Sequence, residues 1–146
     1  MAAFHELVRA ALPRLTADNY RITSRASWEY NCIAWALGLT DAWWWPVPGR
    51  YWPAGVLWEE TVAAFVAAFA TLGYKPCAGT DLEPGVEKTA LFARDETPTH
   101  AARQLPSGLW TSKLGPSIDI EHSTPEVVGG GGYGEMVAVL ARKAVT

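Results

Sequence analysis

The sequence predicts a single α+β domain over residues 1–146, in which N-terminal helices pack on an antiparallel sheet. The first half has apolar residues at helical spacing, most clearly over 61–72, where Phe65 and Phe69 share one stripe. After Cys77 the chain changes to segments of strand length that are separated by turns. Helices followed by strands, with no helix between the strands, are typical of this fold class.

Three helices are predicted from apolar periodicity and from the residues that end each pattern. They cover residues 1–12, before Pro13, residues 32–37, before Gly38, and residues 61–72, before Gly73. The stretch 41–55 contains three prolines and two glycines among its aromatic residues, so it predicts an ordered, Trp-rich loop rather than a regular element.

Four strands are predicted in the second half. They are EKTALFAR (87–94), THAARQL (99–105), LWTSKLG (109–115) and YGEMVAVLARK (133–143). The loop Pro-Ser-Gly at 106–108 suits a three-residue hairpin turn, which pairs Leu105 with Leu109 and sets Ala102 opposite Ser112.

Composition excludes several classes of partner. The formal net charge is −3, without the basic surface that nucleic-acid binding requires, and no apolar stretch is long enough for a membrane span. The N-terminus lacks the layout of a signal peptide, which predicts a cytoplasmic protein and leaves export by a non-Sec route open. The two cysteines, Cys32 and Cys77, are predicted to be free thiols. Neither a cofactor nor a metal centre is predicted.

Cys32 and His100 form a candidate catalytic pair. Cys32 opens a predicted helix, whose free N–H groups and macrodipole favour a thiolate. His100 stands at the start of a predicted strand, from which an imidazole could take the thiol proton and return it to a leaving group. Many chains carry one residue of each kind, so an unreactive thiol buried in the core is the alternative interpretation of Cys32.

The residues around this pair resemble those of NlpC-type, CHAP and papain-like cysteine hydrolases. Those families have a helix that begins at the nucleophile, then an apolar strand, a strand that opens with histidine and a strand with a third polar residue. The chain is also similar to an uncharacterised bacterial family that shares YNCIAWALG, the Trp-Trp-Trp-Pro loop, THAARQL and WTSKLG. The resemblance implies a papain-like or NlpC-like core with Cys32 as nucleophile and His100 as base.

Ser112 and Asp119 are the candidates for a third residue that orients the imidazole. The predicted hairpin register places Ser112 diagonally near His100 on one sheet face, with Trp110 beside the site. Asp119, in the segment that follows, is the fallback because a carboxylate orients an imidazole more strongly.

Asn31 and Tyr30 are the candidate oxyanion or substrate-binding groups, because they directly precede Cys32. The chain departs here from the resembling families. Asn31 stands where NlpC enzymes have aspartate, and the upstream glutamine of papain-like enzymes is missing.

Tryptophan is unusually frequent, with eight residues in the chain, five of them between Trp43 and Trp58. Three consecutive tryptophans cannot all face one way, so at least one of residues 43–45 is predicted to be exposed or to line a cleft. Trp44 is the candidate for such a wall. The alternative is that these tryptophans fill the core or hold the loop in place.

These features predict a cysteine hydrolase, a peptidase or amidase, that cleaves an amide or related acyl bond through a thioester on Cys32. Its substrate would be a peptide, a protein or a peptidoglycan-like amide. The same residues would serve a transglutaminase or deamidase type of acyl transfer. The alternative from a different class is a non-catalytic interaction module that binds a partner or glycan through its Trp-rich loop.

Overall fold

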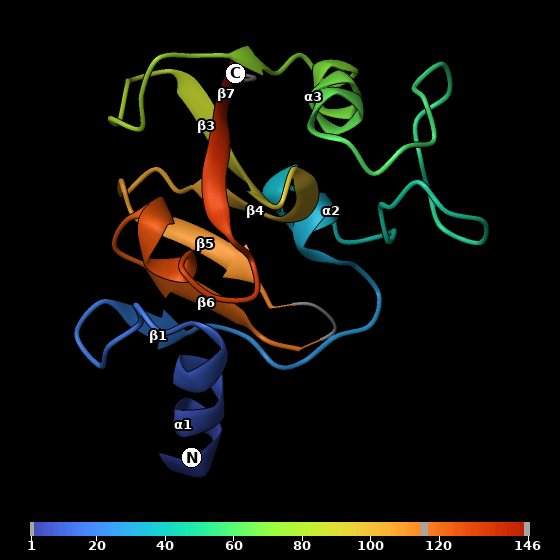
Figure 1. The fold of residues 1–146 in the computed structure, drawn as a ribbon. Coiled ribbons are helices and arrows are strands. Elements are labelled where there is room, and N and C mark those ends of the chain that lie inside the picture. The colour runs from blue at the N-terminus through green and yellow to red at the C-terminus, as the bar shows by residue number, and fades with distance from the viewer. Residues whose placement is uncertain (1, 115–116, 145–146) are drawn as a thin grey trace.

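The computed structural model describes residues 2–114 and 117–144. Its centre is one seven-stranded antiparallel sheet in the order β1-β6-β5-β4-β3-β7-β2 (Figure 1). The strands are β1 (Tyr20–Ile22), β2 (Lys75–Pro76), β3 (Val86–Arg94), β4 (Thr97–Gln104), β5 (Trp110–Lys113), β6 (Asp119–His122) and β7 (Glu135–Lys143).

In the described part of the chain, four short helical elements accompany the sheet: α1 (Ala2–Ala11), α2 (Cys32–Ala36), α3 (Val62–Ala70) and the 3-10 helix η1 (Pro125–Val128). Helices α2 and α3 each begin at a capping side chain. The side chains of Asn31 and Thr61 accept hydrogen bonds from the backbone N–H groups of Ala34 and Ala64. Within the described residues, no helix has the length and apolar character to cross a membrane.

The predicted fold class is wrong. The prediction was a set of N-terminal helices packed on a sheet in a papain-like core, whereas the structure is a β-rich fold in which the sheet dominates. Helix α2 is only five residues long, and its pattern stops where Gly38 takes a φ of 78°. Strands β1, β2 and β6 have two to four residues, too few to show the alternation by which a strand is recognised.

The two faces of the sheet carry separate apolar cores. The face that packs against α2 and α3 is called the α2 face here, and the opposite one, packed against α1 and η1, is the α1 face. Successive side chains of a strand point to opposite faces, so the neighbours Ala101 and Ala102 of β4 lie in different cores. The α2-face core includes Ile33, Phe65, Phe69, Leu91 and Leu140, and the α1-face core includes Leu12, Phe92, Trp110, Ile120 and Val128.

Two local predictions are confirmed. In the hairpin between β4 and β5, the Leu105 N–H donates to the Leu109 carbonyl at 2.7 Å, and Gly108 has a φ of 91°. Gln104 then pairs with Trp110, which is the predicted register. Helix α3 buries Phe65 and Phe69 completely, as its apolar stripe predicts, whereas Val66, which was also expected to be buried, is only half-buried.

Candidate functional site

Cys32 is the first residue of α2 and lies in the α2-face core, 6% exposed. Its Sγ lies 3.9 Å from the backbone carbonyl of Thr99, to which the thiol donates. Burial raises the pKa of the Cys32 thiol to about 11, although the backbone N–H of Ala101 and the Lys113 ammonium act in the opposite direction. The thiol is therefore protonated at neutral pH, despite its place at a helix start.

His100 is fully buried on the α1 face. Its ring stacks on the ring of Tyr133, with centroids 4.0 Å apart and planes 7° apart, and Phe92 packs beside it. Its Nε2 lies 2.9 Å from the Ser112 hydroxyl. Cys32 packs on the opposite face, so the structure does not bring the thiol and the imidazole together: each hydrogen-bonds to other groups.

A buried chain of hydrogen bonds continues from His100 through Ser112 to His122. The Ser112 hydroxyl lies 2.8 Å from His122 Nε2, and His122 Nδ1 lies 2.8 Å from the Thr124 carbonyl. A carbonyl only accepts, so Nδ1 of His122 carries the proton and Nε2 accepts from Ser112. The serine oxygen then accepts from His100 Nε2–H.

Both imidazoles of this chain are neutral at neutral pH. Burial lowers the pKa of His100 well below its usual range and lowers the pKa of His122 to about 4. The assigned direction of the bonds leaves Nδ1 of His100 as a buried acceptor, and this atom has no hydrogen-bond partner among the described residues. Ser112 stands beside His100 as predicted from the register, while a catalytic role for either stays a prediction.

His122 was missed in the sequence as a partner of Ser112. The sequence offers only a weak signal for it: Ile120 and His122 are two residues apart, so they would share a face if the segment after β5 were known to be a strand. Paired as a strand, this segment places Trp110 opposite His122 and Ser112 opposite Ile120 on one face.

Asp119 lies on the α2 face, opposite to His100, because it pairs with Lys113 across β5 and β6. Its Oδ2 accepts a hydrogen bond of 2.9 Å from the Tyr30 hydroxyl, and Lys113 Nζ lies 5.0 Å from the Tyr30 ring centroid. Burial and the nearby carboxylate raise the pKa of Tyr30 to about 12. Tyr30 thus holds Asp119, and the structure does not place either beside the imidazole.

Asn31 connects α2 to the Trp-rich loop. Its Oδ1 accepts from the backbone N–H groups of Ala34 and Trp44, and its Nδ2 donates to the Trp44 carbonyl at 2.7 Å. The side chain is 3% exposed. Through these bonds, Asn31 holds the Trp-rich loop against α2. A role of Asn31 in binding an oxyanion stays a prediction.

The tryptophans divide into buried anchors and exposed rings. Trp44 and Trp110, predicted to line the site, are buried, at 4% and 2% exposure. Trp43 and Trp45 are half-buried, whereas Trp28 and Trp58 are exposed, at 73% and 54%. The exposed indole rings therefore lie before and after the Trp-Trp-Trp run, at Trp28 and Trp58, and not within it.

Both thiols are free, as predicted. In residues 2–114 and 117–144, His, Cys, Asp and Glu side chains nowhere gather in a group of three that could hold a metal ion.

Comparison with known proteins supports the uncharacterised family and not the hydrolase families. No curated protein and no solved structure matches the chain. The model of a domain of unknown function, DUF7689, matches residues 21–141, a span that runs from β1 into β7. The chain belongs to the DUF7689 family.

Proposed function

We propose that this chain is a non-catalytic binding domain whose segment 28–60 docks a basic segment of a partner protein. The observation that carries the proposal is a set of exposed aromatic side chains on a segment that also contains four exposed acidic residues and that the core holds in place. Figure 1 shows the part of this segment that follows α2 extending away from the sheet before the chain returns to α3.

Several side chains anchor the segment. Trp45 packs edge-on against Phe65 of α3 at 5.0 Å between ring centroids, and its Nε1 donates to the Glu60 carboxylate. Trp52 also contacts Phe65 and donates from Nε1 to the Leu57 carbonyl at 2.9 Å. A surface held in this way loses little conformational entropy when a partner binds.

The exposed residues have the composition of a protein-binding surface. Trp28, Tyr51, Leu57 and Trp58 are each about half exposed or more. Trp and Tyr are the residues that contribute most binding energy at protein interfaces, and groups of exposed large apolar side chains mark interaction sites.

Charge indicates the chemistry of the partner. Segment 28–60 contains four acidic residues and one basic residue, and the rest of the chain contains eleven of each. The net charge of −3 is thus carried entirely by this segment. The four acidic residues are all exposed: Glu29, Asp41, Glu59 and Glu60.

Carboxylates beside exposed indole rings favour arginine and lysine side chains, which pair with the former and lie over the latter. The segment already contains one such contact. The Arg50 guanidinium lies 4.7 Å from the Trp43 ring centroid, and Trp43 stacks with Trp28 at 6.4 Å. The partner would extend this arrangement over Trp28.

A cysteine hydrolase has less support. It would need an accessible thiolate next to an imidazole, whereas Cys32 is buried with a raised pKa and His100 faces the other side of the sheet.

The test is a titration of the full chain with two peptides, (Arg-Gly)4 and (Glu-Gly)4, followed by tryptophan fluorescence and calorimetry. We expect binding of the arginine peptide only. The double variant Trp28→Ala, Trp58→Ala should weaken it roughly tenfold or more, whereas Leu82→Ala, an exposed leucine outside the segment, should not change it.

Charge is tested separately with Glu29→Gln, Glu59→Gln, which should also weaken binding of the arginine peptide. Equal binding of both peptides, or unchanged affinity in the tryptophan variant, would refute the proposal. Covalent labelling of Cys32 by an acyl-type activity probe at neutral pH would establish the hydrolase instead.

A further inference from the structure

Strand β7 has one edge that is only partly covered. It pairs with β3 from end to end, whereas β2, its neighbour on the other side, pairs with it only at Leu140 and Ala141. The Cys77 N–H adds one bond, to the Val139 carbonyl at 2.9 Å. Among the described residues, no strand lies beside residues 135–138 on that side, and no backbone hydrogen bond reaches them from it. This part of β7 is therefore an open sheet edge.

A hollow of about 360 Å³ lies along this edge. It is lined by residues 136–139 of β7 and by Pro76 and Cys77, where β2 ends. Successive side chains of a strand point to opposite faces of a sheet, so a hollow that touches four consecutive residues lies beside the edge and not on one face. An added strand would occupy this hollow in line with β2.

The chain does not continue β2 into the hollow, because it turns away after Cys77. The Gly79 carbonyl accepts from the Cys77 thiol and, at 2.8 Å, from Lys88 Nζ. Lys88 belongs to β3 and is only 2% exposed, so this contact fixes the turn. The position that would extend β2 along β7 is therefore left to another chain.

A β-bulge limits what can pair at this edge. The register of β3 and β7 shifts between Leu91 and Phe92, which leaves Val137 without a partner in β3. The Val137 side chain is 48% exposed. A bulge increases the local twist of an edge, so a long flat strand fits it poorly. Pairing between two copies of this edge would set two bulges against each other, whereas a short flexible peptide can follow the twist.

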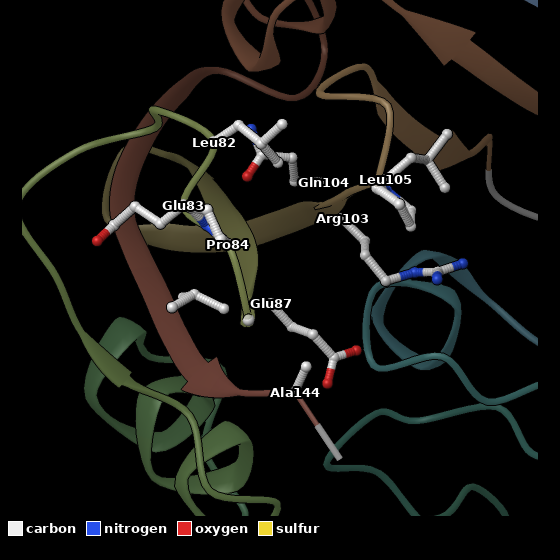
Figure 2. A pocket seen from close by; sticks show the side chains of 11 residues that line it. Leu82, Glu83, Pro84, Glu87, Arg103, Gln104, Leu105 and Ala144 are labelled. Carbon is white, nitrogen blue, oxygen red and sulfur yellow. The ribbon is translucent and has the colours of Figure 1, made fainter. Parts of the chain in front are cut away.

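The walls of the hollow indicate the chemistry of such a peptide. All six residues that line it are uncharged and apolar. Glu135, which begins β7, already forms an ion pair with Arg14 at 2.8 Å. The cavity at the other end of β7 differs, because Glu83, Glu87 and Arg103 contribute to its wall (Figure 2). A charged side chain in the edge hollow would lose hydration without gaining a partner, so apolar side chains are favoured.

We propose that the open edge of β7 at residues 135–138 binds an extended, apolar segment of a partner protein as an additional strand. Every second residue of this segment would bond to β7, because the N–H and C=O groups of a strand point alternately to its two sides. Its side chains would contact Met136, Val137 and Cys77. The inference does not depend on the proposed function of segment 28–60, whose residues lie outside this hollow.

The probe is the peptide acetyl-Ser-Thr-Val-Thr-Val-Ser-amide, titrated into the isotope-labelled full chain and followed by NMR. We expect saturable shifts of the amide signals of Cys77 and residues 135–139. The same peptide with N-methyl groups on its threonines and valines lacks the donors that strand pairing needs and should bind roughly tenfold more weakly or worse. A peptide with aspartate in place of both valines should also bind more weakly.

Val137→Lys places a charge on the edge and should reduce affinity for the peptide roughly tenfold or more. Leu82→Lys, at a side chain that is similarly exposed, at 50%, is the matched control and should bind like the unmodified chain. The thermal midpoint of each variant shows that it is folded. Absence of shifts up to the solubility limit of the peptide would overturn the proposal, as would equal binding of its N-methylated form; both need only the unmodified chain.

Sedimentation of the chain without peptide tests the other occupant of the edge, a second copy of the chain. We expect a monomer, because the bulge opposes pairing of two such edges. A dimer that Val137→Lys dissociates would assign the edge to a second copy and would overturn the proposal.

Discussion

The two faces of the sheet solve the burial of polar groups in different ways. On the α1 face, His100, Ser112 and His122 form a neutral chain of hydrogen bonds. On the α2 face, Lys113 and Asp119 lie under Tyr30, whose hydroxyl donates to the carboxylate. Ser112 and Lys113 are neighbours in one strand, yet each belongs to a different type of polar site.

This difference explains why Cys32 and His100 hydrogen-bond to different groups. Cys32 belongs to the charged side of the sheet and His100 to the neutral side, with β4 between them. A histidine one position later in β4, in place of Ala101, would point to the face that Cys32 contacts. A shift of one position along β4 therefore decides whether a histidine side chain points to the face of the sheet that Cys32 contacts.

The largest effect is expected for the α2-face core. Phe65→Ala should cost about 3–5 kcal/mol in the free energy of unfolding, because the ring is fully buried and contacts both Trp45 and Trp52. Urea unfolding measures the loss, and the exposed Leu57→Ala serves as control. A loss under roughly 1 kcal/mol would show that this core does not hold the Trp-rich segment.

The next largest effect is a pH dependence of stability that arises from His122 on the α1 face. The folded-state pKa of His122, about 4, lies below its ordinary value of 6.5, so the unfolded chain binds the proton first as pH falls. The contribution to stability is fully present above pH 6.5 and is lost between pH 6.5 and pH 4, up to about 3 kcal/mol. Free energies of unfolding measured across this range should show a clearly smaller slope in His122→Gln. An unchanged slope would contradict a buried neutral imidazole.

A smaller loss is expected at the charged site. Tyr30→Phe should cost about 2 kcal/mol, because Asp119 loses the donor to its Oδ2 while the carboxylate stays buried. Tyr51→Phe, at a ring that is 48% exposed, is the matched control and should be close to neutral. If the two variants unfold at the same urea concentration, Tyr30 does not stabilise the carboxylate.

The smallest effect concerns thiol reactivity. A pKa of about 11 leaves little thiolate on Cys32, and the greater nucleophilicity of a more basic thiol offsets only part of this. Iodoacetamide at pH 8 should therefore label Cys32 roughly tenfold more slowly than the half-buried Cys77, as read by mass spectrometry. His100→Ala should leave the Cys32 rate unchanged. Faster labelling of Cys32, lost in that variant, would support the predicted catalytic pair of Cys32 and His100.

Long, regular segments could be read from the sequence. The stripe of Phe65 and Phe69 predicts α3 and its buried face, and Pro-Ser-Gly predicts the hairpin that pairs Leu105 with Leu109. Both depend on contacts between residues close in the chain. The prediction of the fold class failed because β1 pairs with β6, about a hundred residues away, and neither strand is long enough to show a hydrophobic pattern typical of strands.

By itself the sequence determined the local chemistry: a thiol at a helix start, a histidine in a strand and a serine two residues from a tryptophan. It also determined that the aromatic segment 28–60 carries the net charge. Only the tertiary structure decided which of these groups share an environment. Strand pairing and the side-chain alternation of period two assign each residue to one face of the sheet, and burial then sets the pKa of the group placed there. The short hairpin between β4 and β5 places Ser112 beside His100 on one face of the sheet. Cys32 contacts β4 from the opposite face.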